Sequence, residues 1–136
     1  MKVALGQFPL VWEDIDANLD AWSERLKTLA NDVDLIVLPE MFTTGFSMHV
    51  AEIAEPMDGK AVRWLKQQAE KLSVTILGSI ICGDEEKVYN RAVLAKSDGA
   101  ISNYDKRHLF TFADEDKHFT AGTERMIVEV KGWKVC

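Results

Sequence analysis

The sequence contains only two cysteines, Cys82 within an apolar segment and Cys136 at the last position. Two cysteines do not make the disulfide framework on which many small secreted domains depend, so we expect a cytoplasmic protein. Long hydrophobic runs are also missing, because none approaches the roughly 20 apolar residues that a membrane helix needs. The sequence therefore predicts no membrane partner.

Basic residues are few. The chain has 16 lysines and arginines against 22 aspartates and glutamates, a net charge of -6, which argues against a nucleic-acid partner. The glycine-rich motifs of nucleotide-binding loops, GxxxxGK[ST] and GxGxxG, are absent. The three histidines, His49, His108 and His118, lie in separate stretches and form no recognisable pair of ligands, so we expect no zinc site. Small-molecule chemistry is the better expectation.

The patterns that are present predict one α/β domain. The 136 residues are 47% hydrophobic and 28% charged, as in globular domains. Apolar spacing predicts a helix from Ile15, capped by Asp14 or Asp16, and a second helix that opens at Asp58-Gly59. Strands are expected in residues 2–8, 35–38, 74–82, 88–96 and 101–104. Residues 126–136 are expected to form two strands separated at Lys131-Gly132. Residues 43–57 are expected to form a long loop. This order predicts a layered sandwich with helices on one face of a sheet.

Glu40 stands where the strand of residues 35–38 should stop. Pro39 cannot donate to a sheet ladder, so the pairing ends there and Glu40 lies at the carboxyl edge of the sheet. That edge is where α/β sheets commonly place their chemistry. The alternative is that Glu40 is one more solvated loop acid.

A second group of charged residues follows the strand that ends near Tyr104. Residues 104–110 read YDKRHLF, and the acidic run 114–116 contains Glu115. Basic residues beside acids are typical of a solvated ion-pair face, and the spacing of Lys106 and Glu115 does not by itself distinguish that face from a site.

Taken in order, Leu38-Pro39-Glu40, the YDKRHL run and Glu115 ahead of Ala121-Gly122 resemble the nitrilase superfamily of carbon–nitrogen hydrolases. The likeness extends to Gly6-Gln7, to Asn90 and to the closing GWKVC. The EMFTTGF and YDKRHLF segments are similar to the omega-amidase branch, which hydrolyses the terminal amide of 2-oxoglutaramate and related dicarboxylate monoamides. A nitrilase or an N-carbamoyl-amine hydrolase is the alternative within the superfamily.

The resemblance implies a role for each matching residue. Glu40 matches the general base, Lys106 the cation that stabilises the tetrahedral oxyanion, and Glu115 a supporting carboxylate. Phe42 and Phe46 are expected either to line the amide pocket or to anchor their loop. The resemblance also implies that no metal or organic cofactor is required, that the fold is an α-β-β-α sandwich, and that the full-length enzyme is a homodimer.

The nucleophile is not expected among these residues. In the family a cysteine supplies it, and Cys136 matches a strand position about four residues ahead of that cysteine. We therefore expect residues 1–136 to be the N-terminal half of a carbon–nitrogen hydrolase domain, truncated just before the catalytic thiol. A lone half would expose apolar surface and strand edges. A function of another class also remains open, namely an inactive half-domain that only binds a partner or substrate.

Overall fold

The chain folds around one five-stranded sheet in which the strands follow their order in the sequence. A computed structural model describes residues 1–84 and 86–136. Strands β1 (Val3–Leu5), β2 (Leu35–Val37) and β3 (Thr75–Asp84) run parallel, whereas β4 (Lys87–Ala95) and β5 (Ile101–Asp105) continue the sheet as an antiparallel meander. The predicted α/β sheet and its meander are confirmed.

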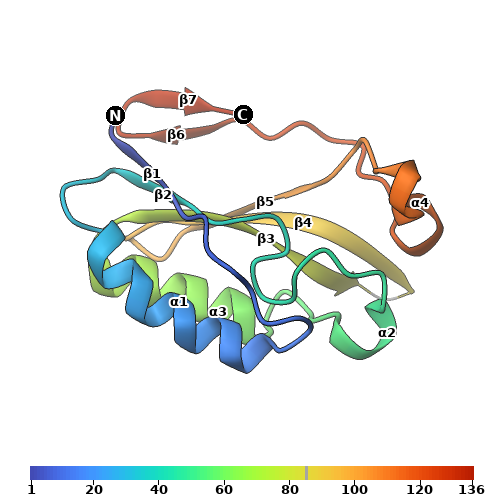
Figure 1. The fold of residues 1–136 in the computed structure, drawn as a ribbon. Coiled ribbons are helices and arrows are strands. Elements are labelled where there is room, and N and C mark those ends of the chain that lie inside the picture. The colour runs from blue at the N-terminus through green and yellow to red at the C-terminus, as the bar shows by residue number, and fades with distance from the viewer. Residues whose placement is uncertain (85) are drawn as a thin grey trace.

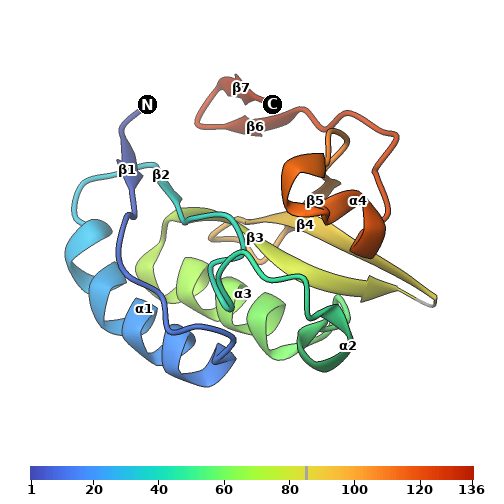
Figure 2. The ribbon, with the colours of Figure 1, turned by 45° about the vertical axis from the view of Figure 1, so that its right-hand side comes forward.

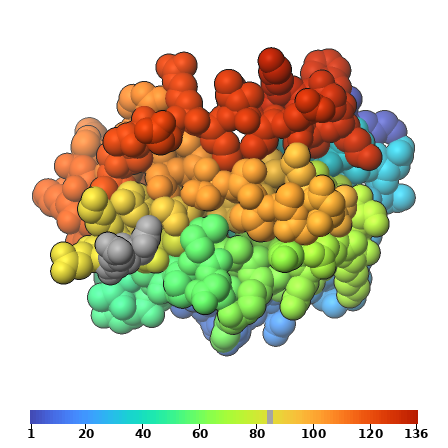
Figure 3. Space-filling model, turned by 180° about the vertical axis from the view of Figure 1, so that it is seen from behind, coloured from blue at the N-terminus to red at the C-terminus, as the bar shows by residue number. Residues whose placement is uncertain are grey.

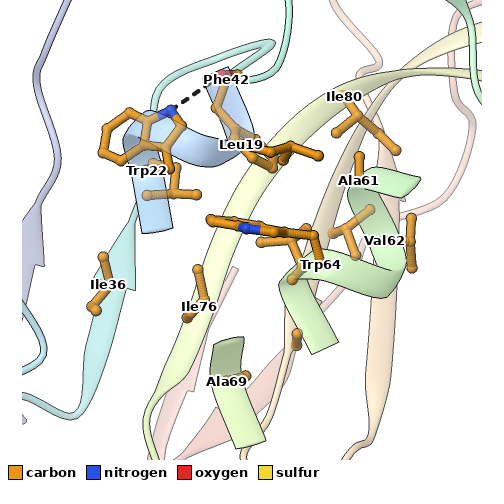
Figure 4. Close-up of a cluster of buried hydrophobic side chains, with 14 of the residues drawn as sticks. Leu19, Trp22, Ile36, Phe42, Ala61, Val62, Trp64, Ala69, Ile76 and Ile80 are labelled. Atoms are coloured by element: carbon orange, nitrogen blue, oxygen red, sulfur yellow. Dashed lines mark hydrogen bonds between the residues drawn. The ribbon is translucent and has the colours of Figure 1, made fainter. Parts of the chain in front are cut away.

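Two amphipathic helices cover one face of this sheet (Figure 1), as the sequence predicts. Helix α1 (Ile15–Leu29) is capped by Asp14, whose carboxylate accepts a hydrogen bond from Ala17 N at 2.9 Å. Helix α3 (Lys60–Leu72) begins after Gly59. Between these helices and the sheet lies the main core, in which Trp22 has no exposed surface and its indole Nε1 donates to the carbonyl of Phe42 at 3.2 Å (Figure 4). The apolar faces therefore hold the helices against the sheet.

The two connecting segments contain short helices that periodicity did not predict. Residues 43–57, expected to form a loop, include helix α2 (Val50–Ile53). The segment after β5 contains a 3₁₀ turn, η1 (Thr111–Ala113), and helix α4 (Glu115–His118). A helix of four residues completes about one turn, which is too short for a repeating apolar stripe.

The last residues form a hairpin over the other face of the sheet. Strands β6 (Val128–Val130) and β7 (Trp133–Val135) pair antiparallel, and Lys131 and Gly132 turn between them with φ of 50° and 79°. Positive φ at both central residues is the geometry of a type I′ hairpin turn. Figure 2 shows the hairpin above the sheet, on the side away from α1 and α3, and Figure 3 shows the C-terminal residues as a band along one edge of the molecule.

The hairpin covers part of the apolar sheet face that was expected to be open. Val130 is buried with Leu35 of β2 and Leu94 of β4. Other apolar side chains stay exposed, among them Leu5 at 73% and Ile127 at 65%. In the described part of the chain, no helix is both long enough and apolar enough to span a membrane.

Candidate active site

Glu40 lies just beyond the carboxyl end of β2. The last ladder bond of this strand runs from Leu38 N to the Leu77 carbonyl at 2.7 Å, and Pro39 follows. The chain then turns through Met41, whose φ is 48°, and Met41 N donates to the Ser79 hydroxyl at 2.8 Å. This turn leaves the Glu40 side chain 47% exposed at the sheet edge.

Lys106 directly follows β5 and reaches toward Glu40. Its backbone extends the β4–β5 ladder by one bond, from Lys106 N to the Asn90 carbonyl at 2.9 Å. Its ammonium donates to Glu40 Oε1 at 2.7 Å and to Glu115 Oε2 at 2.9 Å. The structure thus brings together three residues whose spacing in the sequence gave no such indication.

Glu115 is the first residue of α4, and its side chain has no exposed surface. The carboxylate accepts hydrogen bonds from Phe110 N at 2.6 Å, from the Lys106 ammonium and from the Asn90 side chain. A buried carboxylate with this many donors is fixed in place.

Asn90, on β4, connects the two carboxylates. Its amide Nδ2 donates to Glu40 Oε1 at 2.6 Å and to Glu115 Oε1 at 2.9 Å, and the residue is 2% exposed. Asn90 belongs to the residues that carry the resemblance, but no part in the site was expected of it from the sequence. The available signal was an asparagine in the interior of a predicted strand, where this residue type is uncommon.

The hydrogen bonds favour the charged forms of the buried groups. Burial opposes the charge of Lys106, but its bonds to Glu40 and Glu115 outweigh that effect and raise the lysine pKa above its usual 10.5. Burial likewise opposes the charge of Glu115, but the bonds from Phe110 N, Asn90 and Lys106 bring the pKa of this carboxyl below its usual 4.5. At neutral pH the site therefore holds an ammonium next to an ionised, buried carboxylate.

A hollow of about 430 Å³ opens beside these charges, lined by Glu40, Phe46, Lys106, His108, Leu109 and Phe110. The Phe46 ring lies 5.3 Å from the Lys106 ammonium, which is within the range of a cation–π contact. The hollow therefore combines a positive charge, a carboxylate and an aromatic wall.

Phe42 is not brought to this hollow, contrary to its expected role in the amide pocket. Its side chain has no exposed surface, and its ring packs 5.7 Å from that of Trp64 in the main core. The reason is the turn at Met41, after which Phe42 N donates to the Ser79 carbonyl at 3.1 Å and the side chain is buried between sheet and helices. The alternative expectation, an anchor for the loop, fits this position.

The two cysteines also lie outside this hollow. Cys82 is fully buried, with its sulfur 3.5 Å from Nη1 of Arg91, and Cys136 is exposed beside the hairpin. Among the described residues, no group of three or more histidine, cysteine, aspartate or glutamate side chains is arranged to hold a metal ion.

Comparison with known proteins identifies the fold and the family. The Carbon-nitrogen hydrolase family model matches residues 2–135. Omega-amidase YafV of Yersinia enterocolitica is 43% identical over 135 residues, which are 99% of this chain and 52% of that protein. The 2-oxoglutaramate amidase of Bacillus subtilis is 32% identical over 131 residues, 94% of this chain and 51% of that protein.

The structural comparison agrees. The crystal structure of XC1258 from Xanthomonas campestris, described as a CN-hydrolase superfamily protein with an arsenic adduct in its active site, superposes with a TM-score of 0.94 at 44% identity. The superposition covers 98% of this chain and 50% of that one. The chain thus spans about half the length of the relatives it matches, and it belongs to the carbon–nitrogen hydrolases of the nitrilase superfamily, with omega-amidases among its relatives.

Proposed function

We propose that the full-length protein is an omega-amidase that hydrolyses 2-oxoglutaramate or a similar small dicarboxylate monoamide. The observation that carries this proposal is the Lys106 ammonium, held by Glu40 at 2.7 Å and by the buried Glu115 at 2.9 Å at the rim of a hollow. Amide hydrolysis needs a base and a fixed positive charge where an oxyanion develops, and this arrangement supplies both. The names of the relatives from Yersinia and Bacillus support the choice of substrate.

The proposed reaction begins with a thiol. We expect a cysteine shortly after Cys136 to supply it, with residues 1–136 as the N-terminal part of the domain. Glu40 takes the proton of the thiol, and the sulfur attacks the amide carbon. The carbonyl oxygen becomes an oxyanion, which the Lys106 ammonium stabilises.

Glu40 then completes both halves of the reaction. When the carbon–nitrogen bond breaks, the proton held by Glu40 passes to the nitrogen and ammonia leaves a thioester on the enzyme. Glu40 next takes a proton from water, whose oxygen attacks the thioester and releases the carboxylic acid and the thiol. Throughout, Glu115 keeps the lysine charged and oriented.

The geometry of Glu40 suits a base. Both hydrogen bonds to its carboxylate, from Lys106 and Asn90, end on Oε1. Within the described residues, Oε2 has no hydrogen-bond partner. Oε2 is therefore the oxygen available to accept a proton.

The test is ammonia release by the full-length protein from 2-oxoglutaramate, beside a nitrile and an N-carbamoyl amine. We expect turnover of the first, and we expect Glu40→Gln and Lys106→Ala each to lower kcat by about 10²-fold or more. Glu24→Gln and Lys27→Ala, which break an exposed ion pair on α1, are matched controls that should retain activity.

The outcomes separate the alternatives. If the protein turns over the nitrile or the N-carbamoyl amine but not 2-oxoglutaramate, it is a nitrilase or an N-carbamoyl-amine hydrolase, respectively. Binding of an amide without turnover of any of the three compounds would favour the binding-only function. Light scattering of the same sample tests the homodimer that the resemblance implies.

A further inference from the structure

Arg91 and Asp105 form a partly buried ion pair that joins β4 to β5. The two residues are direct cross-strand partners in the ladder. Arg91 Nε donates to Asp105 Oδ1 at 2.6 Å and Nη2 donates to Oδ2 at 2.9 Å, while the two side chains are only 9% and 20% exposed. Two parallel hydrogen bonds between planar groups fix orientation as well as distance.

Each member of this pair is the sequence neighbour of a site residue. Asn90 precedes Arg91, and Lys106 follows Asp105. Arg91 lies on the helix-covered face, because its guanidinium contacts the sulfur of Cys82, a residue of the main core. Successive side chains of a strand point to opposite faces, so Asn90 projects from the other face. The pair is consequently absent from the lining of the hollow.

The backbone connects the ion pair to the site. The bond from Lys106 N to the Asn90 carbonyl, at 2.9 Å, continues the ladder immediately beyond Arg91 and Asp105. The side chains of these two hydrogen-bonded residues both donate to the Glu115 carboxylate, Asn90 Nδ2 to Oε1 and Lys106 Nζ to Oε2, each at 2.9 Å. A shift between the ends of β4 and β5 would move one donor relative to the other and break this shared contact.

We infer that Arg91 and Asp105 are positioning residues, which fix the ends of β4 and β5 so that Asn90 and Lys106 meet Glu115 and Glu40 in the reactive arrangement. The inference rests on the proposed function for its kinetic consequence. This role differs from a purely stabilising one. The site requires the orientation that the two parallel hydrogen bonds between Arg91 and Asp105 impose, whereas stability requires only that the two charges neutralise each other. A misplacement of about 1 Å in such a site lowers rates by up to about 10²-fold.

Two variants of the full-length protein separate these roles. Arg91→Gln leaves the Asp105 carboxylate without its charged partner and should lower both stability and kcat. Arg91→Gln combined with Asp105→Asn removes both charges and so leaves no carboxylate without its partner, and the melting temperature should return toward that of the wild type. Without the bidentate fork, kcat should stay reduced by about tenfold, while KM stays within about twofold. The control is Lys60→Gln combined with Asp16→Asn, which removes an exposed ion pair between the helices.

Recovery of kcat together with stability in the double variant would overturn the inference, as would an unchanged kcat in Arg91→Gln. The rates are measured with whichever amide the wild type hydrolyses, so a wrong substrate assignment does not affect this comparison. A crystal structure of the double variant gives a reading that needs no activity. We expect the Lys106–Glu115 contact to lengthen beyond hydrogen-bonding distance, and an unchanged contact would contradict the positioning role.

Discussion

Replacing Glu115 with glutamine tests whether this carboxylate holds the site together. The substitution preserves the shape of the side chain but removes its charge and replaces one acceptor oxygen with a donor NH₂ group. The present carboxylate accepts from Phe110 N and Lys106 on Oε2 and from Asn90 and Lys106 on Oε1. Whichever way the glutamine is oriented, its NH₂ group therefore faces at least one donor.

The size of the loss follows from these contacts. A hydrogen bond to a charged group contributes about 1.5–3 kcal/mol, and breaking a buried ion pair from one side costs about 3–5 kcal/mol. Lys106 keeps its bond to Glu40, so we expect Glu115→Gln to lower the free energy of unfolding by about 3 kcal/mol at neutral pH. The matched control is Asp114→Asn, which removes an exposed charge one residue away; Asp114 and Lys117 are 58% and 66% exposed, and such pairs contribute at most about 1 kcal/mol.

The difference between wild type and Glu115→Gln should also depend on pH. Because the folded-state pKa of Glu115 is lowered, its stabilisation is fully present above the usual value of 4.5 and is lost as the pH falls through the lower folded value. Urea unfolding of the full-length protein at neutral and at acidic pH measures both quantities. A cost no larger than that of Asp114→Asn, or a difference that does not shrink in acid, would refute this account of Glu115.

Two further predictions concern packing around the site. A Cβ atom at Gly122 would clash with the Asp105 carbonyl oxygen, so Gly122→Ala should shift the backbone ahead of Lys106, destabilise the protein by about 1–3 kcal/mol in urea unfolding and lower kcat. Unchanged unfolding and kinetics would show that the contact relaxes freely. Phe42→Ala should lower the free energy of unfolding by about 3–5 kcal/mol because the ring is fully buried. Phe46→Ala, at the half-buried wall of the hollow, should mainly raise KM. Equal effects of the two substitutions on stability would contradict this division.

The elements with strong periodicity could be predicted from the sequence. The apolar stripe from Ile15 predicts α1, and Asp14 and Asp16 mark where it begins, because the cap and the stripe are local properties of the chain; the structure selects Asp14 as the cap. Lys131-Gly132 likewise marks the turn of the β6–β7 hairpin. Helices α2 and α4 could not be predicted, since each is only four residues long.

The site depends on contacts that no local pattern contains. Glu40 and Lys106 are 66 residues apart, and only the resemblance to the nitrilase superfamily placed them together before the structure did. Phe42 and Phe46 occupy the same loop and looked equivalent, yet the turn at Met41 buries one and leaves the other beside the lysine. Asn90 was missed because the polar residue of a strand is informative only once its cross-strand neighbours are known.

The two carboxylates on Lys106 have different environments, and this difference suits them to different tasks. Glu115 is fully buried and accepts bonds on both oxygens, so it is held ionised and serves to orient the lysine. Glu40 is 47% exposed and is bonded only through Oε1 among the described residues, so Oε2 is the oxygen that takes the thiol proton in the proposed mechanism while Oε1 keeps its bonds. In the proposed mechanism a single acid could not do both, because its protonation would release the cation proposed to stabilise the oxyanion. Asn90 makes the arrangement possible by donating to both acids without adding charge.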